Sequence, residues 1–518
     1  MKLWRKNFIF VVMRRLIIGL MCLLFPLAVL GQASQQGPAQ VSAQQAQAAS
    51  QAQQYLLDQV QGGVLKGAAV SVYAKDACGK ILLEINAQTR LTPASNLKLI
   101  TTGTALHALG PEFRFQTRLG YTGSIGPDGT LKGDLYLMGG GDPTLGAKDS
   151  IAYKADALFW KWKTLLTQAG IKRIDGRIIG DGRLWEGHLE NASWSYDDAG
   201  TYYGTGSSAL CFYQNAIDYS VKATADGQPV EVTQTYPETP WMHFSNHSVT
   251  GPVGSGNSLY LYTTDLAPYA ELRGTYSLER RPKVEHFANK FGALTCAYYF
   301  WRNLKATGWE VTGGYADISR GGLIRSGADF TEEGPAARYP GVIGVIDSPR
   351  LADIARMANV RSDNFYAEAL CRAMGEAATG IATYDSCRVA VAEVLRGLGL
   401  DPSAMKMEDG SGLSRMNQVS AAFMVDFLQA MTGSPAFPAF LATLPHPGEG
   451  SLYSIQVAEP ERICLKSGSM DGVLCYSGYI LDAKGQLAVT LSFLANGLLA
   501  RPAEVRAVFT RLLLLLFR

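Results

Sequence analysis

The chain has 518 residues, a formal net charge of +2 and 47% hydrophobic residues, so it is long enough for more than one domain with a sizeable core. The near-neutral charge, without a basic run interleaved with aromatic residues, argues against a nucleic acid partner. The eight cysteines are sparse and form no CxxC pair, so the sequence indicates no zinc site and implies no metal or cofactor.

The N-terminus has the layout of an export signal. Met13-Arg14-Arg15 is followed by an apolar stretch, Leu16 to Leu30, and by small residues near Gly31 to Ala33. The stretch is short for a membrane span, so an uncleaved anchor is the alternative, and Met13 is an alternative start. We expect residues 1–33 to be a signal peptide. The mature protein would be periplasmic or extracellular and would have no stable membrane span.

The next elements lead to a short helix. Residues 34–54 are rich in Gln, Ala and Ser, which predicts a low-complexity linker. Residues 68–86 are typical of two strands around a turn at Asp76 to Gly79. The segment LTPASNLKLITTGTALHALG then has a helix start near Pro93 and apolar residues at helical spacing. This pattern places Ser95 in the first turn of a helix.

The pattern changes over residues 116–344 and changes back after them. Runs such as TRLGYTG, LKGDLYLM, RIDGRIIGD and SLYLYTT alternate with Gly, Asp and Pro turns, which predicts a β-rich insertion. Apolar stripes in RLADIARMANV, DNFYAEALCRAMG and SCRVAVAEVLRGLG predict helices, and ICLKSGSM, LCYSGYILD and LAVTLSFLAN predict the last strands. The order predicts a sheet assembled from both chain ends, with helices on its faces.

The sequence also makes predictions about the closing helix and about disulfides. The apolar run Leu512 to Phe517 is too short to span a bilayer, so we expect the closing helix to pack on the sheet. Two disulfides are candidates in an exported chain, Cys464 with Cys475 and Cys371 with Cys387. The alternative is that all these cysteines are buried thiols.

Three short motifs occur in order along the chain: Ser95-Asn96-Leu97-Lys98, Ser362-Asp363-Asn364 and Lys466-Ser467-Gly468. Each is weak by itself, but the ordered set is typical of β-lactamases and penicillin-binding proteins. The alternative is structural: a helix start at Ser95, a helix cap at Ser362 and a solvated strand residue at Lys466.

The chemistry explains these residue types. A serine hydroxyl needs a base within hydrogen-bond reach, and the spacing puts Ser95 and Lys98 on one helix face. Burial and a second cation, Lys466, would lower the pKa of Lys98. Ser362 could relay a proton to the leaving amine, and Asn364 could hold the substrate or Lys98. An edge strand carrying KSGS would let an extended peptide pair alongside it. The amides of Ser95 and Ser469 would then form an oxyanion hole.

A Ser-His-Asp hydrolase is the competing enzyme type. The sequence has six histidines but no GxSxG elbow. We expect His107 and His286 to be helix residues and His446 to lie in a loop, rather than to act as bases.

With these motifs in place, residues 55–515 resemble the class C low-molecular-mass penicillin-binding proteins, which are D-alanyl-D-alanine carboxypeptidases and endopeptidases. The blocks that carry the resemblance are PASNLKLITT, GDLYLMGGGDPTL, SDNFYAEAL, DGSGLSRMNQVS and KSGSMDGV. The resemblance implies an α+β, β-lactamase/penicillin-binding transpeptidase-like domain, an antiparallel sheet with helices on both faces. That domain would comprise residues 55–115 and 345–518. Residues 116–344 would form inserted β-rich domains, in two subdomains.

The resemblance also implies roles for individual residues. Ser95 would be acylated with Lys98 as its base, and Ser362, Asn364 and Lys466 would complete the centre. The residues that would bind substrate are Ser467, Ser469, Asp198, Tyr203, Arg415 and Met470. Asp198 would pair the amine, and Arg415 the carboxylate, of a diaminopimelate-type side chain. The substrate would be a peptidoglycan stem peptide, and β-lactams would be covalent inhibitors.

Two departures from the family pattern leave other functions open. The third motif is KSG where KTG is commoner, although serine keeps the hydroxyl. An ExxLN motif for a deacylating water is not clearly present, because the segment Glu186 to Asn191 has one residue too many. A β-lactamase or esterase on the same fold is one alternative. A peptidoglycan-binding scaffold without activity is the other.

Overall fold

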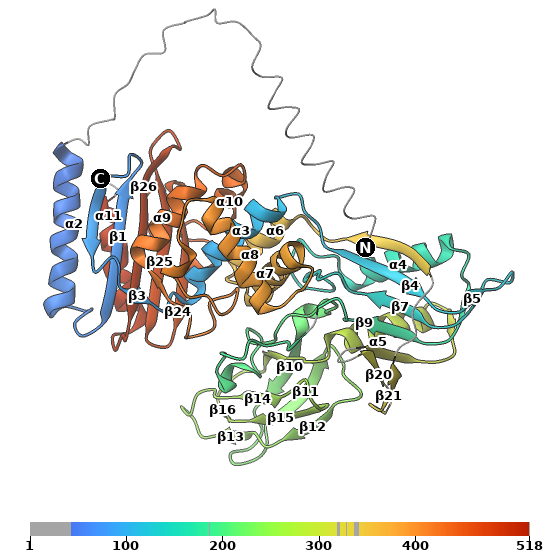
Figure 1. Ribbon diagram of the computed structural model, residues 1–518. Helices are drawn as coiled ribbons and strands as arrows, with labels where there is room; N and C mark the ends of the chain where they lie inside the picture. The colour runs from blue at the N-terminus through green and yellow to red at the C-terminus, as the bar shows by residue number, and fades with distance from the viewer. Residues whose placement is uncertain (1–42, 186, 319–321, 328, 336–340, 517–518) are drawn as a thin grey trace, which may run out of the picture. The chain divides into compact units, whose positions relative to one another are not determined.

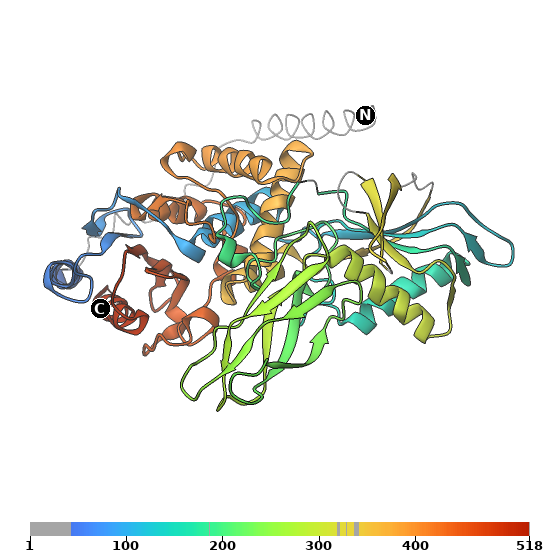
Figure 2. The same cartoon turned by 90° about the horizontal axis from the view of Figure 1, so that it is seen from below.

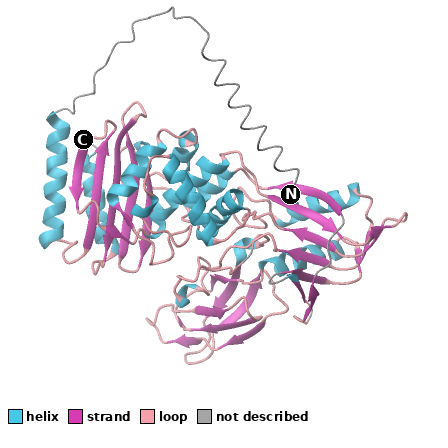
Figure 3. Ribbon diagram, viewed as in Figure 1, coloured by secondary structure: helices cyan, strands magenta, loops and turns pink. Residues whose placement is uncertain are grey.

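The computed structural model describes residues 43–516, apart from residues 186, 319–321, 328 and 336–340. The predicted signal peptide, residues 1–33, and the alternative start at Met13 lie outside the described residues. Figure 3 shows a chain in which groups of helices and several separate sheets are combined.

The main sheet has five antiparallel strands taken from both ends of the chain (Figure 1). Its order is β2 (Ile81–Ile85), β1 (Ala69–Asp76), β26 (Leu487–Asn496), β25 (Val473–Leu481) and β24 (Ile463–Met470). Strand β1 pairs with β26 along its whole length, from Ala69 opposite Asn496 to Asp76 opposite Val489. The predicted joining of the two chain ends is therefore correct, and β24 is an edge strand.

Each face of this sheet has its own hydrophobic core. Along β1, Val70, Val72 and Ala74 enter one core, while Tyr73 enters the other, as the two-residue period of a strand requires. The first core is shared with α2 (Ala43–Gly62) and α11 (Pro502–Leu516). The closing helix thus packs on the sheet as predicted, and none of the described helices has the length and apolarity that a membrane span requires.

Helix α2 corrects the predicted linker over residues 34–54. It begins at Ala43, and Ala52 and Leu56 on it are fully buried. Because these two residues are four apart, they lie on one helix face and pack together into the core. The low-complexity composition hid this face, since alanine is the only apolar residue over most of the segment.

A group of helices that contact one another, the helical layer, packs on the opposite side of the sheet, and α9 (Ala421–Met431) lies directly on the sheet. The helical layer consists of α3 (Lys98–Leu109), α6 (Leu351–Val360), α7 (Asn364–Thr379), α8 (Tyr384–Gly397), α9 and α10 (Phe437–Thr443). Helix α9 contacts β1 and β26, and α3 contacts α6 and α7 (Figure 1). A short pairing of β3 (Arg90–Leu91) with β23 (Val419–Ser420) joins the two parts of the chain again.

One of the two candidate disulfides is present. Cys371 on α7 is bonded to Cys387 on α8, whereas Cys464 and Cys475 are buried thiols. The strand register explains why the second pair is wrong. Cys464 lies opposite Tyr479 and Cys475 lies opposite Gly468, so the two cysteines occupy different rungs of the β24–β25 hairpin.

The chain between α3 and α6 forms further sheets. A seven-stranded sheet contains β21 (Glu332–Pro335), β20 (Leu323–Ser326), β19 (Tyr315–Ile318), β9 (Ile178–Asp181), β7 (Leu135–Met138), β4 (Gln116–Tyr121) and β22 (Gly341–Asp347), in that order. Beside it is a four-stranded sheet of β18 (Glu310–Val311), β8 (Arg173–Asp175), β6 (Thr130–Lys132) and β5 (Ser124–Ile125). Helices α4 (Ala155–Gln168) and α5 (Gly292–Ala306) belong to this part and were not predicted.

Residues 216–288 form a second group of strands, which Figure 2 shows in green. Its strands are β10 (Ala216–Lys222), β11 (Glu231–Tyr236), β12 (His243–Asn246), β13 (Val249–Gly251), β14 (Tyr260–Thr263), β15 (Tyr269–Arg273), β16 (Thr275–Ser277) and β17 (Lys283–Ala288). These strands have their own core, which includes Ile217, Tyr219 and Leu272. The insertion therefore contains the predicted strands, together with helices α4 and α5.

Candidate active site

Ser95 and Lys98 lie where the main sheet meets the helical layer. A 3₁₀ turn, Ala94–Leu97, carries the serine and leads into α3, whose first residue is the lysine. The Lys98 Nζ donates to Ser95 Oγ at 2.9 Å, to Asn364 Oδ1 at 2.7 Å and to the carbonyl oxygen of Ser411 at 2.7 Å. All three donor positions of this ammonium group are therefore occupied, and one of them holds the serine hydroxyl.

The environment of Lys98 lowers its pKa. Burial of this fully enclosed side chain lowers the pKa to about 8, and the carboxyl groups of Glu368, Asp409 and Asp363 oppose the effect in part. A lysine with a pKa near the ambient pH is partly neutral. It can therefore accept a proton from the serine hydroxyl that it contacts.

Lys466 is the second buried lysine of the site. It lies on the edge strand β24, and its Nζ donates to Ser362 Oγ at 3.0 Å and to the carbonyl oxygen of Ser467 at 2.6 Å. Burial and the neighbouring Lys98 hold its pKa well below the ordinary value. The strand itself approaches the serine closely: a Cβ at Gly468 would lie 2.4 Å from the carbonyl oxygen of Pro93. The glycine of the third motif is therefore a packing requirement.

The second motif links the two lysines. Ser362 has a positive φ of 58°, a costly conformation for a residue other than glycine and one that occurs most often at functional sites. The cap of α7 is Asp363, whose Oδ1 accepts from the amide of Tyr366 at 3.0 Å, so the structural alternative for Ser362 as the cap is wrong. Asn364 accepts from Lys98 and donates through Nδ2 to the carbonyl oxygen of Tyr203 at 3.0 Å.

Two buried carboxyl groups support the site, and the sequence analysis gave them no role. Glu368 accepts from the amides of Gly410 and Ser411 at 3.0 and 2.8 Å, and burial raises its pKa to about 7. Asp409 accepts from the amide of Ser414 and from the indole nitrogen of Trp194. Together they fix the loop whose carbonyl group binds Lys98. The spacing of Glu368 four residues after Asn364, on the same helix face, was the available signal.

The predicted substrate residues on β24 lie along the same edge. The Ser467 hydroxyl is almost buried and donates to Ser451 Oγ at 2.7 Å, while Ser469 is exposed and Met470 is half-buried. Arg415 is exposed and donates through Nη1 to the carbonyl oxygen of Asp471 at 3.3 Å, just beyond Met470. These four residues therefore border the open side of the centre.

Asp198 and Tyr203 approach the centre from the inserted region. The Asp198 carboxyl group is half-buried, and burial raises its pKa, which a hydrogen bond from Tyr203 and the charge of Arg415 oppose. Both residues belong to a loop whose backbone contacts Asn364. All eleven predicted site residues thus fall at one location, with the motif residues on one side and Asp198 and Tyr203 on the other.

The residues considered for a Ser-His-Asp hydrolase and for a β-lactamase have other partners in the structure. His286 is on strand β17, not on a helix as predicted, since its extended segment pairs with β10. Its Nδ1 lies 2.6 Å from Asp218 Oδ1, and Asp218 also accepts from Tyr213 rather than from a serine. In the near match to ExxLN, Glu186 lies outside the described residues, and Asn191 donates to the carbonyl oxygen of Glu408 at 2.5 Å.

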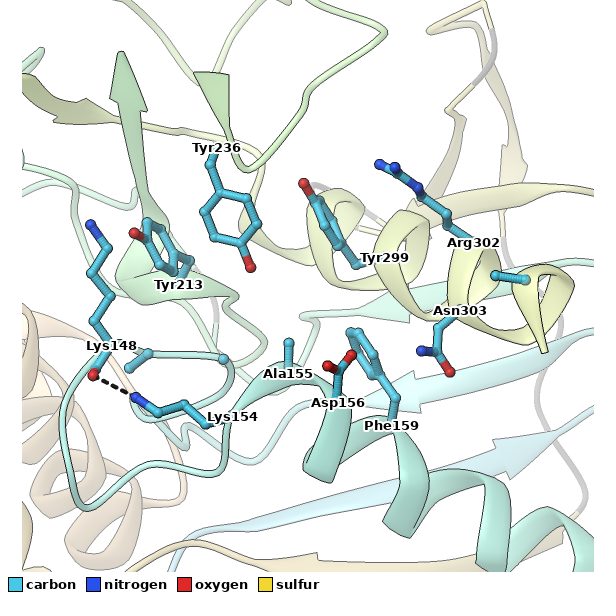
Figure 4. A pocket seen from close by; sticks show the side chains of 13 residues that line it. Lys148, Lys154, Ala155, Asp156, Phe159, Tyr213, Tyr236, Tyr299, Arg302 and Asn303 are labelled. Atoms are coloured by element: carbon cyan, nitrogen blue, oxygen red, sulfur yellow. Dashed lines mark hydrogen bonds between the residues drawn. The ribbon is translucent and has the colours of Figure 1, made fainter. Parts of the chain in front are cut away.

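A cavity of about 540 Å³ lies apart from the motif residues, between helices α4 and α5 and the loop at Tyr213 (Figure 4). Its lysines are already engaged: Lys148 pairs with Asp218, and Lys154 donates to the carbonyl oxygen of Lys148 at 2.8 Å. The rings of Tyr213 and Tyr236 pack edge to face at 4.9 Å. The side chains of Lys148, Lys154, Tyr213 and Tyr236 in the cavity wall are therefore already engaged in contacts within the protein.

Known proteins resemble the chain over nearly this whole structure. Residues 52–512 match the D-Ala-D-Ala carboxypeptidase 3 (S13) family. A D-alanyl-D-alanine carboxypeptidase from Actinomadura sp. is 29% identical over 442 residues, which are 82% of this chain and 78% of the relative.

The solved structures agree on the fold. The crystal structure of penicillin binding protein 4 from Haemophilus influenzae gives a TM-score of 0.75 at 22% identity, and covers 91% of this chain and 99% of that one. The same protein complexed with a novel β-lactam gives 0.68 at 21% identity, with 90% and 97% covered. The expected transpeptidase-like fold with inserted β-rich domains is thus confirmed. The chain belongs to the D-Ala-D-Ala carboxypeptidase 3 (S13) family.

Proposed function

We propose that this chain is a serine DD-peptidase that hydrolyses D-Ala-D-Ala bonds of peptidoglycan stem peptides through an acyl-enzyme on Ser95. The observation that carries the proposal is the contact of the Ser95 hydroxyl with a buried lysine of lowered pKa. The same centre has the chemistry to cut D-alanyl cross-links, because the bond broken there is also a D-alanyl amide.

In the first half of the reaction, Ser95 Oγ attacks the carbonyl carbon of the penultimate D-alanine while Lys98 takes the hydroxyl proton. The amides of Ser95 and Ser469 stabilise the negative charge that develops on the carbonyl oxygen. The C–N bond then breaks, and the proton that Lys98 took is passed through Ser362 to the leaving amine, which leaves Lys98 neutral again. Lys466, 3.0 Å from that hydroxyl, orients it.

In the second half, a water molecule attacks the ester carbonyl, and Lys98 again accepts the proton. The bond to Ser95 Oγ breaks, which releases the shortened peptide and restores the hydroxyl. A penicillin would acylate Ser95 in the same way and leave slowly, which makes it an inhibitor.

Substrate recognition takes place around this centre. The exposed edge of β24 pairs with the extended peptide, and Ser467 and Ser469 bind the terminal carboxylate. Asp198 and Arg415 supply opposite charges for a side chain that carries both an amine and a carboxylate, and Tyr203 and Met470 form the walls beside them.

We further propose that the protein is exported, with residues 1–33 as its signal peptide, so that it acts in the periplasm or outside the cell. Residues 55–115 and 345–518 would form the peptidase domain, and residues 116–344 two inserted subdomains. The separate core of residues 216–288 supports the division of the insertion into two.

The test is the intact mass of the purified mature protein after incubation with penicillin. We expect a stable adduct of one penicillin in the parent and in Ser403→Ala, which changes an exposed serine outside the site, and none in Ser95→Ala. Release of D-alanine from a pentapeptide muropeptide then identifies the substrate. Rapid penicillin hydrolysis without an adduct would instead indicate a β-lactamase. Neither adduct nor hydrolysis would favour a scaffold without activity.

A further inference from the structure

A second hollow adjoins the candidate site on the inserted region. It has a volume of about 440 Å³ and lies between the loop of residues 196–203 and strands β14 and β17. Tyr203 lines it and also belongs to the candidate site, where its carbonyl oxygen accepts from Asn364 at 3.0 Å. The loop that carries Tyr203 therefore connects this cavity to the candidate site.

Tyrosine side chains dominate this cavity, and they are unusually open to solvent. Tyr196 is 75% exposed, Tyr202 57%, Tyr260 39% and Tyr203 37%. The ring of Tyr262 lies 5.7 Å from Tyr196 and 4.9 Å from Tyr260, so these rings form one contiguous group. Exposed aromatic groups of this kind mark binding surfaces, because tyrosine offers a large, rigid face and a hydroxyl at a low cost in entropy.

The polar groups of the cavity define the ligand more closely. Two carboxyl groups line it, Asp197 and Glu285, and the latter also accepts from Asn257 at 2.8 Å. Among the described residues that line the cavity, His286 is the one side chain that can carry a positive charge. Carboxylates and tyrosine hydroxyls accept hydrogen bonds from hydroxyl groups, while ring faces contact apolar C–H faces. Glu285 is also paired with Lys283 at 3.1 Å, so the cavity offers hydroxyl and carboxylate acceptors beside ring faces without a large uncompensated charge, which suits a neutral polyol ring.

When a stem peptide binds at the candidate site, the sugar attached to it can reach the tyrosine-lined cavity. In peptidoglycan the stem peptide is attached to a sugar of the glycan strand. Three to five extended residues span roughly 10–18 Å. Hydrogen bonds from Lys98 to Ser95 and to Asn364, and from Asn364 to the carbonyl oxygen of Tyr203, link the candidate nucleophile to the loop that lines the cavity.

We propose that the cavity lined by Tyr196, Tyr202, Tyr203, Tyr260 and Tyr262 binds a pyranose ring of the glycan strand to which the stem peptide is attached. The proposal rests on the proposed peptidase function. It makes the enzyme selective for glycan-linked stem peptides over free peptides, through contacts that do not involve the reacting atoms.

The test compares kcat/KM for D-alanine release from a disaccharide-pentapeptide with that from the free pentapeptide of the same sequence. We expect the parent to prefer the glycan-linked substrate about tenfold, which is the scale of one aromatic contact. In Tyr196→Ala and Tyr262→Ala this ratio should fall to near one. Tyr269→Ala removes a 52% exposed tyrosine of the same strand group outside the cavity, and should keep the parental ratio.

The possible failures are distinguishable. Equal rates on both substrates in the parent, or equal losses on both in the two variants, would overturn the sugar site and leave the peptidase function standing. If a sugar-free cross-linked peptide dimer depends on the two tyrosines as strongly as the muropeptide, the cavity binds peptide and the sugar assignment is wrong. No D-alanine from either substrate would overturn the proposed function, and with it this inference.

Discussion

The two sides of the site are built differently. On the side of the peptidase motifs, Lys98 and Lys466 are fully buried, and each ammonium group is engaged by serine hydroxyl and backbone oxygens. On the side of the insertion, Asp198 is half-buried and Tyr203 is 37% exposed. Groups that exchange protons are thus held in a closed hydrogen-bond network, whereas groups that meet the substrate remain open to solvent.

This difference has consequences for both energy and rate. Removing a member of a buried network leaves its partners without hydrogen bonds, which lowers stability and disturbs the chemistry together. Removing an exposed group deprives only the bound substrate of a contact. Substitutions on the motif side should therefore affect the acylation rate, and those on the insertion side should affect KM.

The largest effect is expected from Lys98→Met, which removes the base and leaves an unbranched side chain one atom shorter. The acylation rate with penicillin should fall by about 10²–10⁴, the usual range for a lost general base. Lys290→Met is a control for the loss of a buried lysine, because Lys290 pairs with Glu190 at 2.6 Å and donates to the carbonyl oxygens of Gly204 and Thr205, whereas Lys98 donates to Ser95. It should lower the melting temperature and retain the acylation rate. Time-resolved intact mass would measure the acylation rate of both variants, and thermal unfolding their melting temperatures. An unchanged rate in Lys98→Met would refute the assignment of the base.

An intermediate effect is expected from pH. Burial lowers the pKa of Lys98 to about 8, and only the neutral amine can accept the serine proton. The acylation rate should therefore level off above about pH 9 and fall with decreasing pH, by about fiftyfold between pH 8 and pH 6. A rate that is flat over this interval would show that Lys98 does not titrate in the reaction.

Glu368→Gln tests the electrostatic origin of this pH profile. The negative charge of Glu368 raises the pKa of Lys98, so its removal should shift the rising limb of the profile to lower pH. The glutamine also keeps only one of the two oxygens that bind the amides of Gly410 and Ser411, at a cost of about 1–3 kcal/mol in unfolding free energy. A shift of the limb to higher pH would contradict the proposed electrostatics.

The smallest effect is expected from Asp198→Asn. KM for a peptide with a free amine on its side chain should rise about tenfold, since one charge-assisted contact is lost. Penicillin acylation should change little, because Asp198 does not contact the buried lysines. Steady-state kinetics on peptides with and without that amine would measure the difference. An equal rise in KM for both peptides would show that Asp198 does not bind the side-chain amine.

Much of the architecture was already determined by the sequence. The segments ICLKSGSM and LAVTLSFLAN and the turn at Asp76 to Gly79 were predicted to form strands, and the structure contains them. Local patterns are reliable here because both sheet faces are buried, and strands buried on both faces appear as nearly continuous apolar runs. The three motifs also indicated the chemistry, since Ser95 and Lys98 meet within one helical turn.

Only the tertiary structure decided what surrounds these residues. The support of Lys98 comes from Ser411, held by Glu368, and from Asn364, which also contacts Tyr203 in the insertion. The register of β24 and β25 separated Cys464 from Cys475, while α7 and α8 brought Cys371 to Cys387. These contacts join residues far apart in the chain, and composition and periodicity describe only neighbours. Burial sets the pKa of Lys98, and burial is a property of the packed fold.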